Sequence, residues 1–239
     1  MELYERLIRI IDAYVATFGG ATRMHGVQTL LIVQKATRFG NGVSPSTLHR
    51  LTGAPLENIR RRFQQFTERG LITAHPDPKD DRSTLYTMTN RGLSAWPAGD
   101  VARKLYTLRQ TSGRPESPPR LQCPETLSAL LAVLQAFADA LDAGIRIRGY
   151  KTALLIQQAT LSGEGITAST LSRETNAALE TVRRHMAKHE TLGDLKLVEN
   201  PDDERATLVL TANPDREHRA WTAVARRLDA LDWHLFNVT

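Results

Sequence analysis

The residues best suited to chemistry in this sequence are two pairs of arginines. Arg60-Arg61 and Arg183-Arg184 stand at the same distance behind a Leu-Glu dipeptide, and the two pairs are 123 positions apart. A guanidinium group can donate two parallel hydrogen bonds to phosphate oxygens, or to O6 and N7 of guanine. The first hypothesis is therefore recognition of nucleic acid. The alternative is that the run Arg60 to Arg62 only keeps an exposed helix face solvated.

The arginine pairs belong to an internal repeat, which has to be found before any element is assigned. Residues 26–85 align without a gap with residues 149–208, and about 24 of the 60 aligned pairs are identical. The densest block matches residues 46–61 with residues 169–184. Chance or shared helical composition would not keep one register over this length, so the sequence predicts a duplicated structural unit.

The first repeat is expected to position its arginines on the second helix of a pair. A helix over 27–39 ends at Gly40-Asn41-Gly42, and a short helix over 45–52 begins with Ser44 as cap and Pro45 at its first position. The corner Gly53-Ala54-Pro55 leads into a longer helix over 56–69. Two helices joined by a short glycine-containing corner are typical of the helix-turn-helix, whose second helix enters the major groove of DNA.

A β-hairpin is predicted directly after the second helix. Residues 71–75 have strand character, residues 76–82 form a polar turn, and residues 83–88 form the returning strand. A hairpin in this place corresponds to a wing. Arg82, close to its tip, is expected to reach backbone phosphate or the adjacent minor groove.

These motifs resemble those of the MarR family of bacterial transcription regulators. The resemblance rests on Glu68-Arg69-Gly70-Leu71-Ile72, on the Asp-x-Arg of the wing sequence 77–82, and on Leu85 and Met88-Thr89 with Gly92. It covers residues 26–92 well and the second repeat less well. It implies homodimers with interlocked terminal helices, and in many members a small-molecule effector that lowers DNA affinity. Two fused copies then imply a single chain acting as a pseudo-dimer, with further homodimerisation left open.

The second repeat departs from the family pattern in ways that affect its expected contacts. Gly193-Asp194 replaces Gly-Leu, and the wing 200–205 keeps Arg205 but has no counterpart of Lys79. Phosphate would be repelled unless Arg205 reaches it. The helix 179–192 nevertheless retains Arg183, Arg184 and Lys188. Weaker or different contacts are expected here, and whether this repeat touches DNA stays open.

Composition limits the broad class of protein. The net charge is +5, and the first 118 residues account for +7, with 17 Lys and Arg against 10 Asp and Glu. No apolar run is long enough to span a membrane and the N-terminus is acidic, so the expected location is the cytoplasm and no membrane partner is expected. The single cysteine, Cys123, is interpreted as a linker thiol, with an oxidation sensor as the minor alternative.

Amphipathic packing helices are expected on both sides of each repeat, at 3–18, 97–108, 127–141 and 216–231. The prolines and small polar residues of 111–123 indicate a linker between domains 1–110 and 124–239. The expected fold class is mainly α with small β-hairpin wings, as tandem winged helix-turn-helix domains in a pseudo-two-fold, MarR-dimer-like arrangement.

The candidate DNA-binding residues fall on the two helix pairs and the two wings: Ser46, Thr47, Asn58, Arg60, Arg61, Gln64, Arg82, Ser169, Thr170, Thr181, Arg183, Arg184, Lys188 and Arg205. The four hydroxyl residues at the starts of the short helices could equally be helix caps. His185 and His189 lie one helical turn apart, but without a third ligand at useful spacing no metal is expected, and no cofactor.

The sequence therefore predicts a sequence-specific, double-stranded DNA-binding transcription regulator. Its recognition helices, 56–69 and 179–192, would enter successive major grooves about 34 to 36 Å apart. An enzyme is not expected, because glycine-rich phosphate loops and nucleophile-base signatures are missing. Two alternatives stay open: a plasmid-type replication initiator with tandem winged helices, and a protein-interaction or chromosome-scaffold module that binds no DNA.

Overall fold

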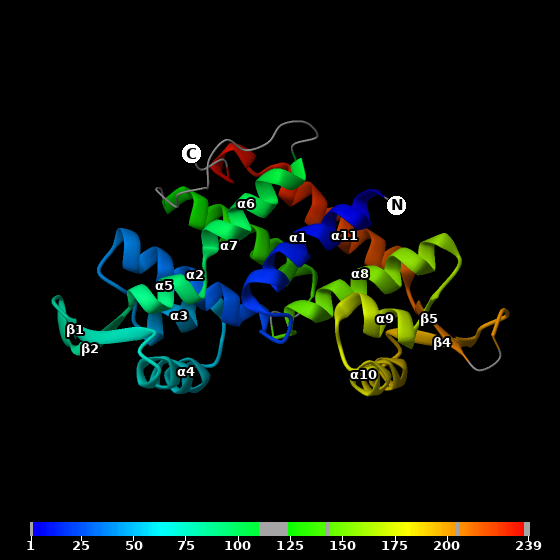
Figure 1. Ribbon diagram of the computed structural model, residues 1–239, viewed down its shortest axis with the longest axis horizontal. Helices are drawn as coiled ribbons and strands as arrows, with labels where there is room; N and C mark the ends of the chain where they lie inside the picture. Colours follow the sequence, from blue (N-terminus) through cyan, green and yellow to red (C-terminus); the bar gives the residue numbers. More distant parts are fainter. Residues whose placement is uncertain (1, 110–123, 142–143, 204–205, 237–239) are drawn as a thin grey trace. The chain divides into compact units, whose positions relative to one another are not determined.

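The computed structural model describes residues 2–109, 124–141, 144–203 and 206–236 of the chain. These residues are mainly helical with small antiparallel sheets, which confirms the expected α-rich class with β-hairpins (Figure 1). Within them, no helix combines the length and the apolar character needed to cross a membrane. The expected linker 111–123, with Cys123, lies outside the described residues.

The chain divides into two compact units that each combine distant segments. One consists of Ala13–Arg146 and Leu231–Thr239, and is called here the first-repeat unit. The other consists of Met1–Asp12 and Ile147–Ala230, and is called the second-repeat unit. This division differs from the expected sequential domains 1–110 and 124–239.

The difference comes from helix α1 (Glu2–Phe18), which is divided between the two units, and from residues 124–146 and 231–239, which join the first-repeat unit. The first part of α1 joins the second-repeat unit, where the Tyr4 hydroxyl lies 2.8 Å from Nδ1 of His218. Its last part joins the first-repeat unit, where the Tyr14 hydroxyl donates to the Leu130 carbonyl at 2.8 Å. Leu130 lies on α7 (Pro124–Ala140), a strongly apolar helix that also packs against α2.

In the first-repeat unit the predicted helices form almost where expected. Helices α2 (Met24–Phe39), α3 (Pro45–Thr52) and α4 (Leu56–Glu68) precede strands β1 (Ile72–Asp77) and β2 (Asp80–Met88). The chain continues with α5 (Asn90–Ala95) and α6 (Ala98–Arg109), and the short 3-10 helix η1 (Trp233–Phe236) belongs to the same unit.

The cap chemistry of α3 agrees with the prediction. Ser44 Oγ accepts a hydrogen bond from the Thr47 amide at 3.2 Å, Pro45 occupies the first turn, and Gly53 ends the helix at φ +66°. The polar turn expected at 76–82 is mostly strand, because β1 and β2 stay paired up to Asp77 and Asp80. Backbone pairing in an exposed hairpin does not require apolar side chains. The polar residues at 76–82 therefore led to a predicted turn that was too long.

The second-repeat unit reproduces this order with helices α8 (Ile147–Ser162), α9 (Ala168–Thr175) and α10 (Leu179–Thr191). Strands β3 (Ile166–Thr167), β4 (Leu195–Glu199) and β5 (Thr207–Thr211) form one sheet in the order β3-β5-β4. Helix α11 (Pro214–Asp229) follows as one continuous element, whereas the first repeat breaks between α5 and α6 at Trp96-Pro97. Proline has no amide hydrogen, which explains the break.

The two repeats agree in strand register as well as in sequence. Ile72 pairs with Met88 in one hairpin, and Leu195 pairs with Thr211 in the other. A threonine hydroxyl on the preceding long helix accepts the same strand amide in both: Thr37 Oγ1 from Met88 at 2.8 Å, and Thr160 Oγ1 from Thr211 at 2.9 Å. The alignment made by sequence therefore describes a real structural duplication.

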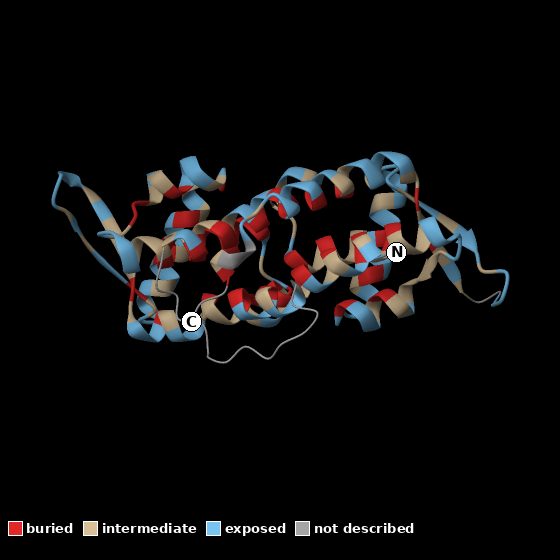
Figure 2. Cartoon of the chain, turned by 90° about the horizontal axis from the view of Figure 1, so that it is seen from above, coloured by how far each residue is buried: buried red, intermediate tan, exposed pale blue. Residues whose placement is uncertain are grey.

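Each repeat has its own small core under its second helix. In the second repeat this core contains Ile156, Leu171, Val182, Met186 and Val209. In the first repeat Phe63 is buried and its ring centroid lies 4.5 Å from that of Tyr86. Figure 2 shows that buried residues gather on the helices while the hairpins are mostly exposed. These cores fix which faces of α4 and α10 remain available to a ligand.

Candidate nucleic-acid interface

Helix α4 has one apolar face and one basic, polar face. Ile59 and Phe63 are buried, whereas Arg60, Arg61 and Gln64 are exposed. Arg60 Nη1 donates to Glu57 Oε1 at 3.1 Å, and both side chains are largely open to solvent, at 59% and 83%. Such exposed pairs contribute little to stability, so the guanidinium group can be redirected to an anionic ligand at small cost.

A groove of about 600 Å³ separates α4 from the β1-β2 hairpin and the start of α3. It brings together four of the predicted site residues: Ser46, Arg60, Gln64 and Arg82. Ser83 and Thr84, which sequence reasoning missed, add hydroxyl groups to its wall, and Glu68 adds a carboxylate. Ser83 and Thr84 directly follow Arg82 on β2, and this position in the sequence could have indicated them as site residues. The groove therefore presents two arginines and several hydroxyl groups between a helix and a hairpin, together with the Glu68 carboxylate, which accepts from Gln64 Nε2 at 3.1 Å.

The structure identifies the side chains that cap helices α3 and α9. The cap residues are Ser44 and Thr167, and each accepts from the amide three positions later at 3.2 Å. The predicted residues bond instead to the cap hydroxyls: Ser46 and Thr47 at 2.9 and 3.1 Å, Ser169 and Thr170 at 2.9 and 3.0 Å. None of the four caps its helix, and Ser46 and Ser169 are exposed.

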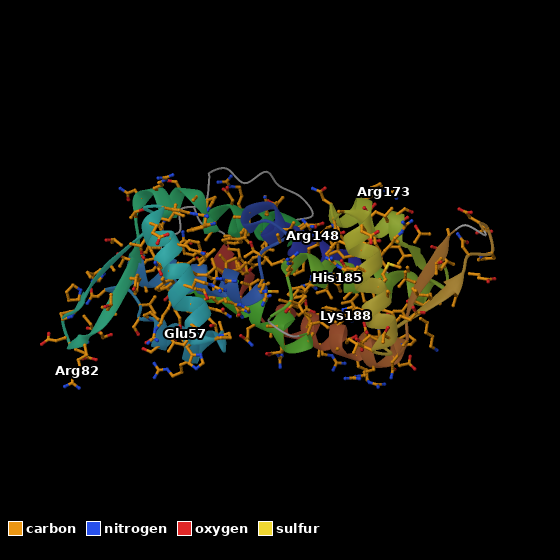
Figure 3. The ribbon with its side chains drawn as sticks, turned by 90° about the horizontal axis from the view of Figure 1, so that it is seen from below. Glu57, Arg82, Arg148, Arg173, His185 and Lys188 are labelled. Atoms are coloured by element: carbon orange, nitrogen blue, oxygen red, sulfur yellow. The ribbon has the colours of Figure 1, made fainter. Side chains whose placement is uncertain are left out.

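Arg82 projects from the end of the first hairpin, as Figure 3 shows. The tip is shaped by two carboxylates that accept backbone amides: Asp77 from Lys79 at 2.9 Å and Asp80 from Arg82 at 3.0 Å. These contacts fold Asp77 and Asp80 back onto the loop backbone, while Asp81 is exposed next to Arg82. The exposed Arg82 side chain remains directed outward.

Helix α10 carries the corresponding residues of the second-repeat unit. Arg183, Arg184 and Lys188 are exposed, Thr181 is half-buried, and Val182 and Met186 face the core. The hairpin beside α10 exposes Glu199, Asp202 and Asp203. The predicted contact Arg205 lies outside the described residues. Over the part that is described, this unit offers a basic helix next to an acidic hairpin.

Sequence reasoning missed an ionisable cluster at the end of α10. His189 Nδ1 lies 2.9 Å from Asp194 Oδ2, and burial, with a smaller contribution from Asp194, raises the pKa of Glu217 to about 6. In the first repeat Phe66 and Leu71 stand at the two aligned positions, where Phe66 packs on Trp96. Among the described residues, no group of three His, Cys, Asp or Glu side chains is placed to hold a metal ion. In this structure the His189 ring contacts the Asp194 carboxylate.

The pKa of Glu217 predicts how stability changes with pH. The folded state binds this proton more tightly than an ordinary glutamate of pKa 4.5, so the free energy of unfolding falls as pH rises from about 4.5 to 6. After allowance for solvent screening, the loss is about 1 kcal/mol. Urea denaturation of the wild type and Glu217→Gln at pH 4.5 and 7.5 measures it. The variant should lack this loss, and equal pH dependence in both proteins would contradict the assignment.

Comparison of the sequence with protein-family models and with curated proteins finds no match.

Proposed function

We propose that this chain is a cytoplasmic, sequence-specific transcription regulator that binds double-stranded DNA. The observation that carries the proposal is the exposed arginine pair on the second helix of a helix-corner-helix, followed by a hairpin and present in both repeats at one spacing. The order of elements and the motifs at 68–92 favour a winged helix-turn-helix of MarR type. A small-molecule effector is part of the same proposal.

In this mechanism α4 enters the major groove with its polar face toward the bases. Arg60 and Arg61 donate to guanine O6 and N7, while Asn58 and Gln64 suit the N6 and N7 edge of adenine. The first amides of α3 and the Ser46 hydroxyl face a backbone phosphate. Arg82 reaches phosphate or the minor groove from the hairpin.

The second repeat would place α10 in the next major groove, about 34 to 36 Å away, so that one chain acts as a pseudo-dimer. Thr181, Arg183, Arg184 and Lys188 would contact the second half-site, with Ser169, Thr170 and Arg205 on the backbone. Because the two helices differ in sequence and the second hairpin has no counterpart of Lys79, the preferred DNA site is an imperfect palindrome.

Selection of bound fragments from a pool of random duplexes tests the proposal. The expected result is enrichment of two unlike half-sites one helical turn apart. Arrays of direct repeats would favour a replication initiator instead. Absence of any enrichment, together with no salt-dependent affinity for duplex DNA, would overturn the proposal and favour a protein-interaction module.

A further inference from the structure

Two arginines at equivalent places in the repeats are joined through their backbones. Arg23 directly precedes α2 and Arg146 directly precedes α8, and the two are 123 positions apart. They form an isolated antiparallel bridge, and the Met24 amide donates to the Ile145 carbonyl at 2.9 Å. Both side chains are exposed. All of these residues belong to the first-repeat unit, so the bridge holds two like charges together within one compact body.

Arg62 of α4 extends this group of charges. Its guanidinium lies against Gly26 of α2, so closely that a Cβ at Gly26 would be 2.7 Å from Arg62 Nη1. Burial, followed by the positive charges of Arg23 and Arg61, lowers the pKa of Arg62. Arg23, Arg62 and Arg146 thus form one cluster, called here the arginine cluster, and Arg61 lies next to it on α4.

Among the residues that the structure describes, no carboxylate neutralises the cluster. In the described part of the chain none of its three guanidinium groups forms an ion pair, and the neighbouring Arg61 donates to the neutral Asn58 at 3.2 Å. Like charges held this close repel each other, and the half-buried Arg62 is screened less by water than an exposed group. An anionic partner would reduce the repulsion between these arginines and would also stabilise the poorly screened charge of Arg62.

The position of the cluster on α4 indicates which anion this is. Arg60 lines the groove toward the hairpin, and Arg62 is two residues on, which is about 200° around the helix. The hairpin groove and the arginine cluster therefore flank α4 on opposite sides. A helix in the major groove is likewise flanked by two sugar-phosphate backbones, one on each side.

We propose that the arginine cluster is a second DNA contact, which binds phosphates of the backbone on the side of α4 away from the hairpin. This inference rests on the proposed function, because it assigns a further contact to the same DNA complex. The contact is independent of sequence: phosphate contacts set affinity and register, and base contacts set specificity. It also gives the Arg23–Arg146 bridge a role in binding.

The test compares two variants of the full chain that lose the same charge. Arg23→Ala with Arg146→Ala removes the bridge side chains, and Arg103→Ala with Lys104→Ala removes two exposed cations of α6. The first variant should bind duplex DNA about 10- to 100-fold more weakly at 0.1 M salt, with a log-log salt slope smaller by about two. Its selected DNA motif should stay that of the wild type, and the α6 control should bind like the wild type.

Thermal melting controls for folding, since the bridge is made by backbone atoms and should persist. If the alanine pair melts early, Arg23→Gln with Arg146→Gln preserves side-chain bulk and should show the same loss of affinity. Equal binding by the bridge variant and the α6 control, with the wild type binding duplex DNA, would overturn this inference alone. Absence of duplex binding by the wild type would overturn the proposed function and this inference with it.

Discussion

Replacing Arg60, Arg61 and Arg82 together with alanine is expected to weaken binding to the selected duplex by about 100-fold or more. Each good bidentate contact to a base contributes about 1 to 3 kcal/mol of discrimination, and a lost phosphate contact adds a salt-dependent term. The three residues belong to the same helix-hairpin face of the first-repeat unit, and none is buried. Fluorescence anisotropy with a labelled duplex measures the change.

A matched triple variant in the second repeat is the control. Arg183→Ala, Arg184→Ala and Lys188→Ala removes the same charge from α10, next to an acidic hairpin, and should weaken binding less. Single variants separate the roles: Arg60→Ala or Arg61→Ala should relax sequence preference, whereas Arg82→Ala should weaken all sequences and reduce the salt slope by about one. A first-repeat triple variant that binds like the wild type would contradict the assignment of α4.

Gly92→Ala is expected to destabilise the first-repeat unit by about 2 to 3 kcal/mol, in the range of overpacked sites. A Cβ at Gly92 would lie 2.1 Å from the Leu71 carbonyl oxygen and 3.0 Å from its carbon. These backbone atoms cannot yield freely, because the same carbonyl accepts from the Thr89 amide at 3.0 Å and ties the hairpin to α5. Urea denaturation followed by circular dichroism measures the loss.

Ser94→Ala, at an exposed position of the same helix, is the control for Gly92→Ala and should change stability by less than about 0.5 kcal/mol. The second repeat needs no glycine here, because α11 begins after the cap Asn213 rather than at the position aligned with Thr89. An unchanged denaturation midpoint for Gly92→Ala would show that Leu71 and α5 can separate without loss.

Local signals in the sequence were sufficient to predict helices α3 and α4 and the corner that joins them. Ser44-Pro45 and Gly53 define both ends of α3, and the spacing of Ile59 and Phe63 defines the buried side of α4. The exposure of the candidate arginines followed from that spacing. The shift of 123 positions then carried the assignment to the second repeat, where even the strand register agrees.

Long-range features could not be read in the same way. All the flanking helices share one apolar period, so nothing local indicated that α7 packs on α2 or that α1 belongs to both units. Arg62 looked like Arg60 and Arg61 in the sequence, and nothing local indicated that its guanidinium lies against α2, where Gly26 leaves room for it. The raised pKa of Glu217 comes mainly from burial in the folded unit and, to a smaller extent, from Asp194, which lies between α10 and β4.

If the arginine-bearing helices bind duplex DNA, the affinity of the chain for DNA must fall steeply with salt. If the intact chain neutralises about six phosphates, its dissociation constant for the selected duplex should rise by roughly a thousandfold between 50 and 200 mM salt. Anisotropy titrations over that range would give the slope. No measurable binding at 50 mM salt, or an affinity that does not change with salt, would contradict the account.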